Sequence, residues 1–156
     1  MTDLPTYVLQ RTFNAPRELV WKAWTDPSVI THWYGPNVET IIHQLDVTPG
    51  GLWLEEMKWG DNSRDQRAEY TDVFPPERLV WLHAVADGDW NIIADPIMPD
   101  WPRVLRTSIT FDTDGDRTRL KLTQVPHNAT DAEIACFEKA IAEMDNGWAT
   151  GMELQA

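Results

Sequence analysis

The chain has 156 residues, of which 42% are hydrophobic and 24% are charged, and this size and balance predict a single domain built around one core. Its 13 Lys and Arg residues stand against 25 Asp and Glu residues, so the formal net charge is -12. Such a charge repels nucleic-acid phosphates and anionic lipid surfaces, and the basic residues are scattered along the chain. The composition therefore argues against nucleic acid as a partner.

The sequence also argues against a membrane or secreted protein. No stretch approaches the roughly 20 apolar residues of a spanning helix, and the start, Met1 to Pro5, lacks the basic and apolar regions of a secretory signal. Cys136 is the only cysteine, so no internal disulfide can form. We therefore expect a cytoplasmic location and no membrane contact.

The first part of the chain predicts a strand followed by two short helices. Residues 7–13 lie between Pro5 and a helix start signal and predict a strand with Tyr7, Leu9 and Phe13 on one face, which Arg11 interrupts. Pro16 suits the first turn of a helix, where a missing N–H costs nothing. Asp26 can end that helix and cap the next one, which is expected to stop at residues 35–36, Gly-Pro.

The middle of the chain predicts antiparallel strands joined by short turns. From residue 38 onward, runs of β-branched and aromatic residues are separated by clusters of Gly, Pro, Asn and Asp. Residues 85–102 show no sustained period and predict a long loop, of the kind that is either functional or mobile. The predicted strands cover residues 38–47, 51–58, 67–74, 79–84, 104–112 and 117–124.

The last segment, residues 131–152, predicts a long helix with one apolar face and one polar face, so it should lie against a sheet. Gly147 inside this helix lowers its helix propensity by about 1 kcal/mol relative to Ala, which suggests close backbone contact at that point. The apolar face comprises Ile134, Phe137, Ile141, Met144, Trp148 and Met152.

Four short motifs, in this order and spacing, carry a resemblance to a known family. They are Asn14-Ala15-Pro16-Arg17-Glu18-Leu19-Val20-Trp21, His32-Trp33-Tyr34-Gly35-Pro36, Pro49-Gly50-Gly51-Leu52-Trp53 and Asn146-Gly147-Trp148. Together they resemble bacterial domains related to the C-terminal domain of the Hsp90 ATPase activator, within the START-like, Bet v 1-like superfamily. The resemblance implies an α+β helix-grip fold over residues 1–156: a curved seven-stranded antiparallel sheet wraps a long C-terminal helix, and two short helices follow the first strand. A homodimer would also fit the family.

Domains of this superfamily commonly keep a cavity between the sheet and the long helix, so the resemblance implies a binding site for a small hydrophobic or aromatic molecule. The family places an aromatic residue and a Met of the strand after Gly51 inward. Because strand side chains alternate, the resemblance implies that Trp53, Glu55 and Met57 face the interior. The expected ligand-binding residues are Trp33, Trp53, Glu55, Met57, His83, Ile109, Phe111, Leu122, Met144 and Trp148.

Two polar residues on these predicted inward faces have alternative interpretations. A buried carboxylate is costly unless it is paired, so Glu55 either pairs with a residue such as Arg11 or meets a ligand, unless the strand register differs and it faces solvent. Gln124 ends an otherwise apolar face. It either lies near the mouth of the cavity or makes a capping contact to the nearby loop, and we favour the loop contact.

Other motifs give little support for a cofactor or metal. His32, His43, His83 and His127 show no metal-ligand spacing, although a site assembled from distant parts of the chain stays open. His32 and His83 could both reach a cavity, but a hydrogen-bonded structural role is favoured for each. No nucleophile elbow, phosphate-binding loop or dinucleotide fingerprint occurs. We therefore predict no cofactor.

Three functions follow from the sequence. The first is a binding domain with an apolar cavity. The second is an enzyme of the cyclase or hydratase type that uses Glu55 as acid or base, with His83 or Arg11 nearby. The third is partner binding like that of the Hsp90 activator.

Overall fold

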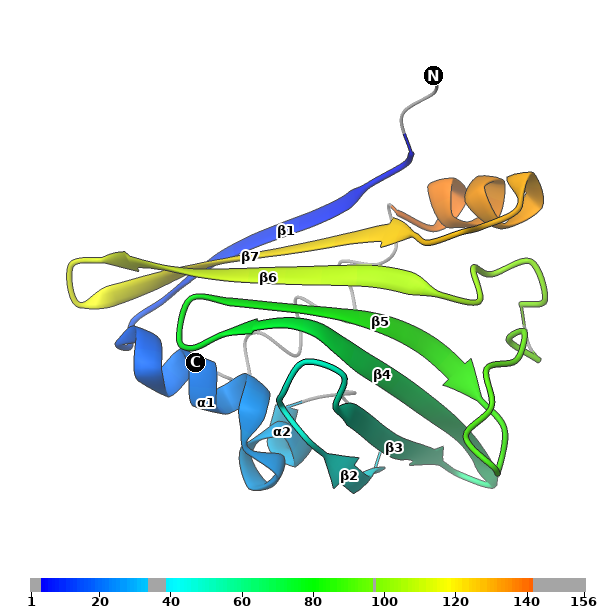
Figure 1. The fold of residues 1–156 in the computed structure, drawn as a ribbon, viewed down its shortest axis with the longest axis horizontal. Coiled ribbons are helices and arrows are strands. Elements are labelled where there is room, and N and C mark those ends of the chain that lie inside the picture. The colour runs from blue at the N-terminus through cyan, green and yellow to red at the C-terminus, as the bar shows by residue number, and fades with distance from the viewer. Residues whose placement is uncertain (1–3, 34–38, 97, 142–156) are drawn as a thin grey trace.

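The computed structural model describes residues 4–33, 39–96 and 98–141, with the backbone alone for residues 31–33. Two helices and seven strands are arranged along this part of the chain, and a further helix covers residues 131–141 (Figure 1). In chain order the elements are β1 (Tyr7–Phe13), α1 (Arg17–Thr25), α2 (Pro27–Trp33), β2 (Glu39–Leu45), β3 (Leu52–Trp59), β4 (Asn62–Phe74), β5 (Arg78–Ala86), β6 (Leu105–Asp114) and β7 (Arg117–Pro126).

The described strands form one antiparallel sheet in the order β1-β7-β6-β5-β4-β3-β2. Every neighbour pair except β1 and β7 is consecutive in sequence, so short connections build most of the sheet. Figure 1 shows α1 and α2 at one end of the sheet, while the helix of residues 131–141 follows β7 at the other end. The predicted fold class is confirmed, and residues 142–152 of the predicted long helix lie outside the described residues.

The clearest difference from the predicted elements is at the start of β4. This strand begins at Asn62 rather than at residue 67, because a two-residue hairpin turn pairs Trp59 with Asn62. Gly60 at the turn has a φ of 57°, which glycine adopts without steric cost. The polar run that follows this turn is therefore strand, although it has the composition of a loop.

The loop between β5 and β6 is also shifted relative to the prediction. The structure extends β5 to Ala86, and β6 begins at Leu105, so the predicted loop of residues 85–102 becomes residues 87–104. An isolated antiparallel bridge joins Ala86, the last residue of β5, to Ile92 in the loop. The first half of this segment is thus held by backbone pairing.

One face of the sheet, which we call the inner face, carries the core. It is the face that bears the buried residues Leu9, Tyr70, Trp81, Ile109 and Leu122. α1 covers it with Val20, Ala23 and Trp24, and the helix of residues 131–141 adds Phe137, which is 0% exposed. This apolar burial is the main stabilising contribution, worth about 1.5–3 kcal/mol for each large side chain.

A capping box fixes the start of the helix of residues 131–141. The Thr130 hydroxyl accepts from the Glu133 N–H at 3.2 Å, and Glu133 Oε1 accepts from the Thr130 N–H at 3.1 Å. Glu133 Oε2 also accepts from the Arg103 N–H at 2.6 Å, which ties the end of the loop to this helix. Desolvation alone would raise the pKa of Glu133, but these hydrogen bonds outweigh it and lower the pKa.

Candidate functional site

Three predicted site residues lie on the inner face of β3, near one edge of the sheet. Trp53 and Glu55 are each 2% exposed, and Met57 packs against the core from a partly buried position. Glu55 is paired in register with Gln66 of β4 and Ile42 of β2. Its carboxyl group therefore faces the interior rather than solvent.

Trp81 of β5 is the centre of an aromatic cluster beside these residues. Its ring centroid lies 6.0 Å from that of Trp53, 6.0 Å from that of Tyr70 and 6.1 Å from that of Trp24. Sequence reasoning did not single out Trp24, Tyr70 or Trp81 as site residues. The alternation that places His83 inward also places Trp81 inward, so that signal was present in the sequence.

Two side chains of this cluster keep unsatisfied donors. Among the described residues, neither the Tyr70 hydroxyl nor the Trp81 Nε1–H has a hydrogen-bond partner. Tyr70 is 1% exposed and Trp81 is 2% exposed. Burial, followed by the charge of Glu55, raises the pKa of Tyr70 well above its ordinary value, so its proton is retained at neutral pH. The inner face thus presents buried donors that can meet an acceptor oxygen.

The pairing of Glu55 with Arg11, one of the alternatives for this carboxylate, is wrong. Arg11 is exposed, and its Nη1 donates to the Gln10 carbonyl at 2.8 Å. β1 and β3 are also separated in the sheet by β7, β6, β5 and β4. Alternation along a strand indicates which face a residue shares, but it does not indicate how far apart two strands lie across the sheet.

The remaining predicted residues fall into distinct surroundings. Ile109, Phe111 and Leu122 are 0% exposed in the core, and Phe111 lies under α1 with its ring centroid 5.4 Å from that of Trp21. His83 is partly buried, and desolvation lowers its pKa to about 4, so it is neutral at pH 7. The side chain of Trp33, together with Met144 and Trp148, lies outside the described part of the structure.

Gln124 is buried at 4% exposure and donates from Nε2 to the Thr107 hydroxyl at 3.0 Å. Thr107 is its register partner on β6. The favoured capping contact to the nearby loop is therefore wrong, because a polar pair across two neighbouring strands satisfies this amide.

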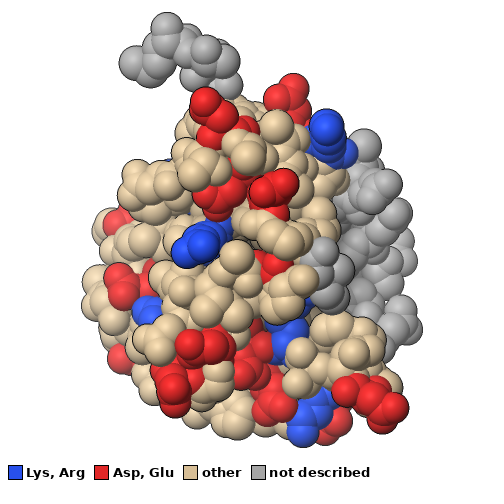
Figure 2. All heavy atoms as spheres, turned by 90° about the vertical axis from the view of Figure 1, so that its right-hand side faces the viewer, with Lys and Arg blue, Asp and Glu red and all other residues tan. Residues whose placement is uncertain are grey.

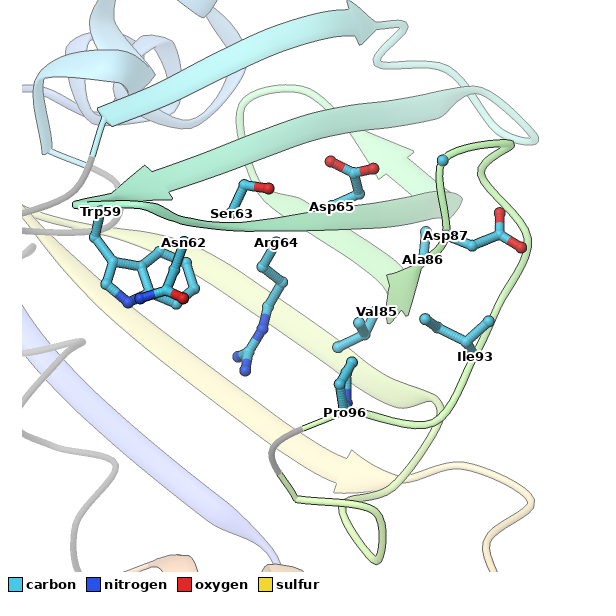
Figure 3. Close-up of a pocket in the computed structure, with 11 residues that line it drawn as sticks. Trp59, Asn62, Ser63, Arg64, Asp65, Val85, Ala86, Asp87, Ile93 and Pro96 are labelled. Atoms are coloured by element: carbon cyan, nitrogen blue, oxygen red, sulfur yellow. The ribbon is translucent and has the colours of Figure 1, made fainter.

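A pocket of about 320 Å³ opens where β3, β4 and β5 meet the loop (Figure 3). Figure 3 shows Trp59, Asn62 and Arg64 projecting to the same side, while Ser63 and Asp65 point the other way, as strand alternation requires. Sequence reasoning missed this pocket. Its lining residues are Trp59, Asn62, Ser63, Arg64, Asp65, Val85, Ala86, Asp87, Gly88, Ile93 and Pro96.

Arg64 is the charged group at the centre of this pocket. Its Nη2 donates to Asp95 Oδ1 at 3.1 Å, and its guanidinium carbon lies 5.9 Å from the centroid of the Trp59 ring. Asp95 is 5% exposed and also accepts from the Met98 N–H at 3.3 Å. The pocket thus contains a largely buried ion pair against an aromatic wall.

β4, which carries Arg64, also holds the loop from its opposite face. Arg67 has the opposite parity to Arg64 along β4, and its Nη1 donates to the Trp90 carbonyl at 3.0 Å. Trp90 has a φ of 66°, which is rare for a bulky residue, and its ring centroid lies 5.5 Å from that of His43 on β2. The loop is therefore anchored to both faces of β4.

The surroundings of the pocket are acidic. Desolvation, followed by the charge of Glu56, raises the pKa of Asp65. His43 opposes this shift, and Asp87 adds a smaller increase. Figure 2 views the end of the molecule that lies to the right in Figure 1, and Asp and Glu side chains are spread across it. Within the described residues, no group of three or more His, Cys, Asp or Glu side chains could hold a metal ion. No helix in that part of the chain is long and apolar enough to span a membrane.

Comparisons with known proteins agree with this architecture. A family model described as "Activator of Hsp90 ATPase homolog 1-like protein" matches residues 14–153, which confirms the resemblance drawn from the motifs. No curated protein sequence matches the chain significantly.

Solved bacterial structures share the fold at low sequence identity. The crystal structure of Ms6760 from Mycobacterium smegmatis is 22% identical with a TM-score of 0.78, over 99% of this chain and 93% of that one. CV1439 from Chromobacterium violaceum is 20% identical with a TM-score of 0.71, over 97% and 94%. CalU16 from Micromonospora echinospora is 19% identical with a TM-score of 0.60, over 96% and 72%.

Proposed function

The chain belongs to the Activator of Hsp90 ATPase homolog 1-like protein family, and on that basis we propose that it is a small-molecule binding domain. Its ligand is a small hydrophobic or aromatic molecule that lies on the inner face of the sheet, against β3, β4 and β5. We also propose that the domain is cytoplasmic, since its one cysteine gives no disulfide.

The observation that carries the proposal is the pair of unsatisfied buried donors. The Tyr70 hydroxyl and the Trp81 Nε1–H are neighbours in register and have no hydrogen-bond partner among the described residues. A buried donor without an acceptor costs about 1–3 kcal/mol, and such groups in folded proteins call for a specific explanation. An oxygen of a bound ligand would recover that cost, while the surrounding rings supply apolar contact.

Other predicted residues extend this site. Trp53 and Met57 lie on the same face as the donors, and His83 follows Trp81 along β5 by two residues, so it shares that face. Trp33, Met144 and Trp148 remain predictions for the same site. A homodimer also remains a prediction.

Ligand titrations read by Trp fluorescence, together with native mass spectrometry, test the proposal across lipids, flavonoids and aromatic acids. For an oxygen-bearing aromatic ligand, Tyr70→Phe should weaken binding by about tenfold, since a hydrogen bond to the ligand is lost. Thr118→Val is the matched control, because it removes a buried hydroxyl that already donates to the Ala15 carbonyl at 2.8 Å. Failure of the whole panel to bind, or equal affinities for wild type and Tyr70→Phe, would contradict the proposal.

A second candidate is acid–base catalysis by Glu55. Two observations favour it. Glu55 is 2% exposed beside the aromatic cluster, and its charge raises the pKa of Tyr70. A carboxyl group in an apolar site can be tuned to exchange protons near neutral pH. Glu55→Gln should abolish turnover while ligand binding persists, and unchanged turnover would exclude Glu55 from the mechanism.

A further inference from the structure

The pocket beside Arg64 adjoins the proposed ligand site without belonging to its aromatic cluster. Val85, which lines the pocket, is paired in register with Gln66, and Gln66 is paired with Glu55. Met57 is paired in the same way with Arg64. A molecule lying along the inner face from the cluster would therefore end in this pocket.

The size of the pocket suits a small ring system. Its volume of about 320 Å³ lies at the lower end of the range of about 300–1,000 Å³ that ligand sites occupy. A cavity of about 150 Å³ already holds benzene. Trp59, Val85, Ile93 and Pro96 supply apolar wall on several sides, so a flat molecule of about two rings fits.

The polar side of the pocket offers hydrogen-bond donors. Arg64 uses Nη2 for Asp95, and its Nε and Nη1 make no hydrogen bond with the described residues. A guanidinium carries several N–H donors and no acceptor. The Asn62 amide projects to the same side (Figure 3). A ligand atom that meets Arg64 must therefore be an acceptor.

The charge balance indicates that this acceptor is neutral. Asp95, at 5% exposure, already compensates the Arg64 charge, and Asp87 also lines the pocket. A ligand carboxylate would add a further anion to this group, in a protein whose net charge is -12. A cationic ligand would be repelled by the Arg64 guanidinium, which lies over the Trp59 ring.

We propose that this pocket binds a neutral, planar aromatic ligand through a carbonyl oxygen, as in an aryl ketone or quinone. The oxygen accepts from Arg64, and the ring lies against Trp59 and Val85. Asp95 holds the guanidinium in place. This inference rests on the proposed function, because it assigns the polar end of the same ligand.

Three probes of similar shape separate the alternatives: 2-acetylnaphthalene, 2-ethylnaphthalene and 2-naphthoate. Affinities come from Trp fluorescence, and ¹H–¹⁵N NMR spectra report the Trp59 indole and Arg64 Nε resonances. The ketone should bind about tenfold tighter than the hydrocarbon, since it gains a hydrogen bond from a charged donor. The naphthoate should bind more weakly than the ketone, and the ketone should shift both pocket resonances.

Variants on the two faces of β4 test the role of Arg64. The double variant Arg64→Met with Asp95→Leu replaces both members of the ion pair by apolar residues, which avoids leaving a buried charge unpaired. In this variant the ketone and the hydrocarbon should bind equally. Arg67→Lys is the control, because Arg67 also anchors the loop but lies on the other face. It should keep the tenfold preference.

Several outcomes would overturn the proposal. Tightest binding of the naphthoate would make the pocket an anion site, and equal binding of ketone and hydrocarbon to the wild type would remove the carbonyl contact. Probe-induced shifts confined to Tyr70 and Trp81, with the pocket resonances unmoved, would reject the pocket while leaving the proposed function standing. Unmoved resonances throughout would also reject the pocket, and the broader ligand panel would then decide the proposed function.

Discussion

Replacing Tyr70 with Phe should make the protein more stable in the absence of ligand. The hydroxyl is buried on a side chain that is 1% exposed and has no hydrogen-bond partner among the described residues. Phe keeps the ring, whose centroid lies 6.0 Å from that of Trp81 in an edge-to-face arrangement. The substitution therefore removes an unsatisfied polar group while the aromatic packing stays.

The expected gain follows from the cost of burying that group. Desolvation of an unsatisfied hydroxyl costs about 1–3 kcal/mol, so Tyr70→Phe should raise the free energy of unfolding by about 1 kcal/mol or more. For a chain of this size, each 1 kcal/mol corresponds to a rise of about 2–4 °C in Tm. Urea and thermal unfolding of the ligand-free protein measure both quantities, and an unchanged m-value shows that the compared states are the same.

Thr118→Val provides the opposite case in the same sheet. Thr118 is 0% exposed, and its hydroxyl donates to the Ala15 carbonyl, so this substitution should cost about 1 kcal/mol. A Tyr70→Phe variant that is less stable than wild type by about 1 kcal/mol would refute the reasoning, because the hydroxyl would then donate a hydrogen bond in solution. Under the proposed function, the same variant is both more stable and weaker in binding, a trade-off known from other binding sites.

Three further predictions concern pH, backbone crowding and capping. His83 has a pKa of about 4 in the folded chain, so between about pH 6.5 and 4 the unfolded state binds a proton that the folded state does not, and stability falls by up to about 3 kcal/mol as pH falls. Urea unfolding at several pH values should show a flatter dependence for His83→Gln, and an unchanged slope would contradict this assignment. Gly51→Ala places a Cβ against the Asp46 carbonyl oxygen and should cost about 1–3 kcal/mol in urea unfolding, whereas Gly88→Ala, with nothing within 4 Å, should change stability by less than about 0.5 kcal/mol. Equal losses for the two glycines would count against the crowding argument. Thr130→Ala removes a helix cap and should lower stability by about 1 kcal/mol, and an unaltered Tm would exclude that role.

Much of the fold could be predicted from the sequence because its elements are separated by residues with specific backbone preferences. Pro16, Asp26 and Gly60 each mark a boundary that the structure keeps. The start of β4 was missed because the run from Asn62 to Asp65 has turn-like composition. These residues are held in the strand by pairing with β3, which does not require an apolar face.

The candidate site was less predictable, because it depends on distances across the sheet. Alternation directed Trp53 and Glu55 to the interior, but it could not show that four strands separate Arg11 from Glu55. Tyr70 and Trp81 meet only through the β4–β5 register. That register includes a shift between Tyr70 and Asp72, which no local sequence pattern predicts.

The pocket beside Arg64 shows why the family motifs and the ligand specificity can be separate properties. Gly50 and Gly51 shape a turn, and Pro16 lies at the start of α1, so these signature residues specify the fold. The polar groups of the pocket instead come from the start of β4 and from a loop that Arg64 and Arg67 anchor from opposite faces. The contact from Arg67 goes to the backbone carbonyl of Trp90, so this attachment can persist when loop side chains change. Under the proposed function, ligand preference should therefore depend on the residues of this loop and of early β4 rather than on the motifs.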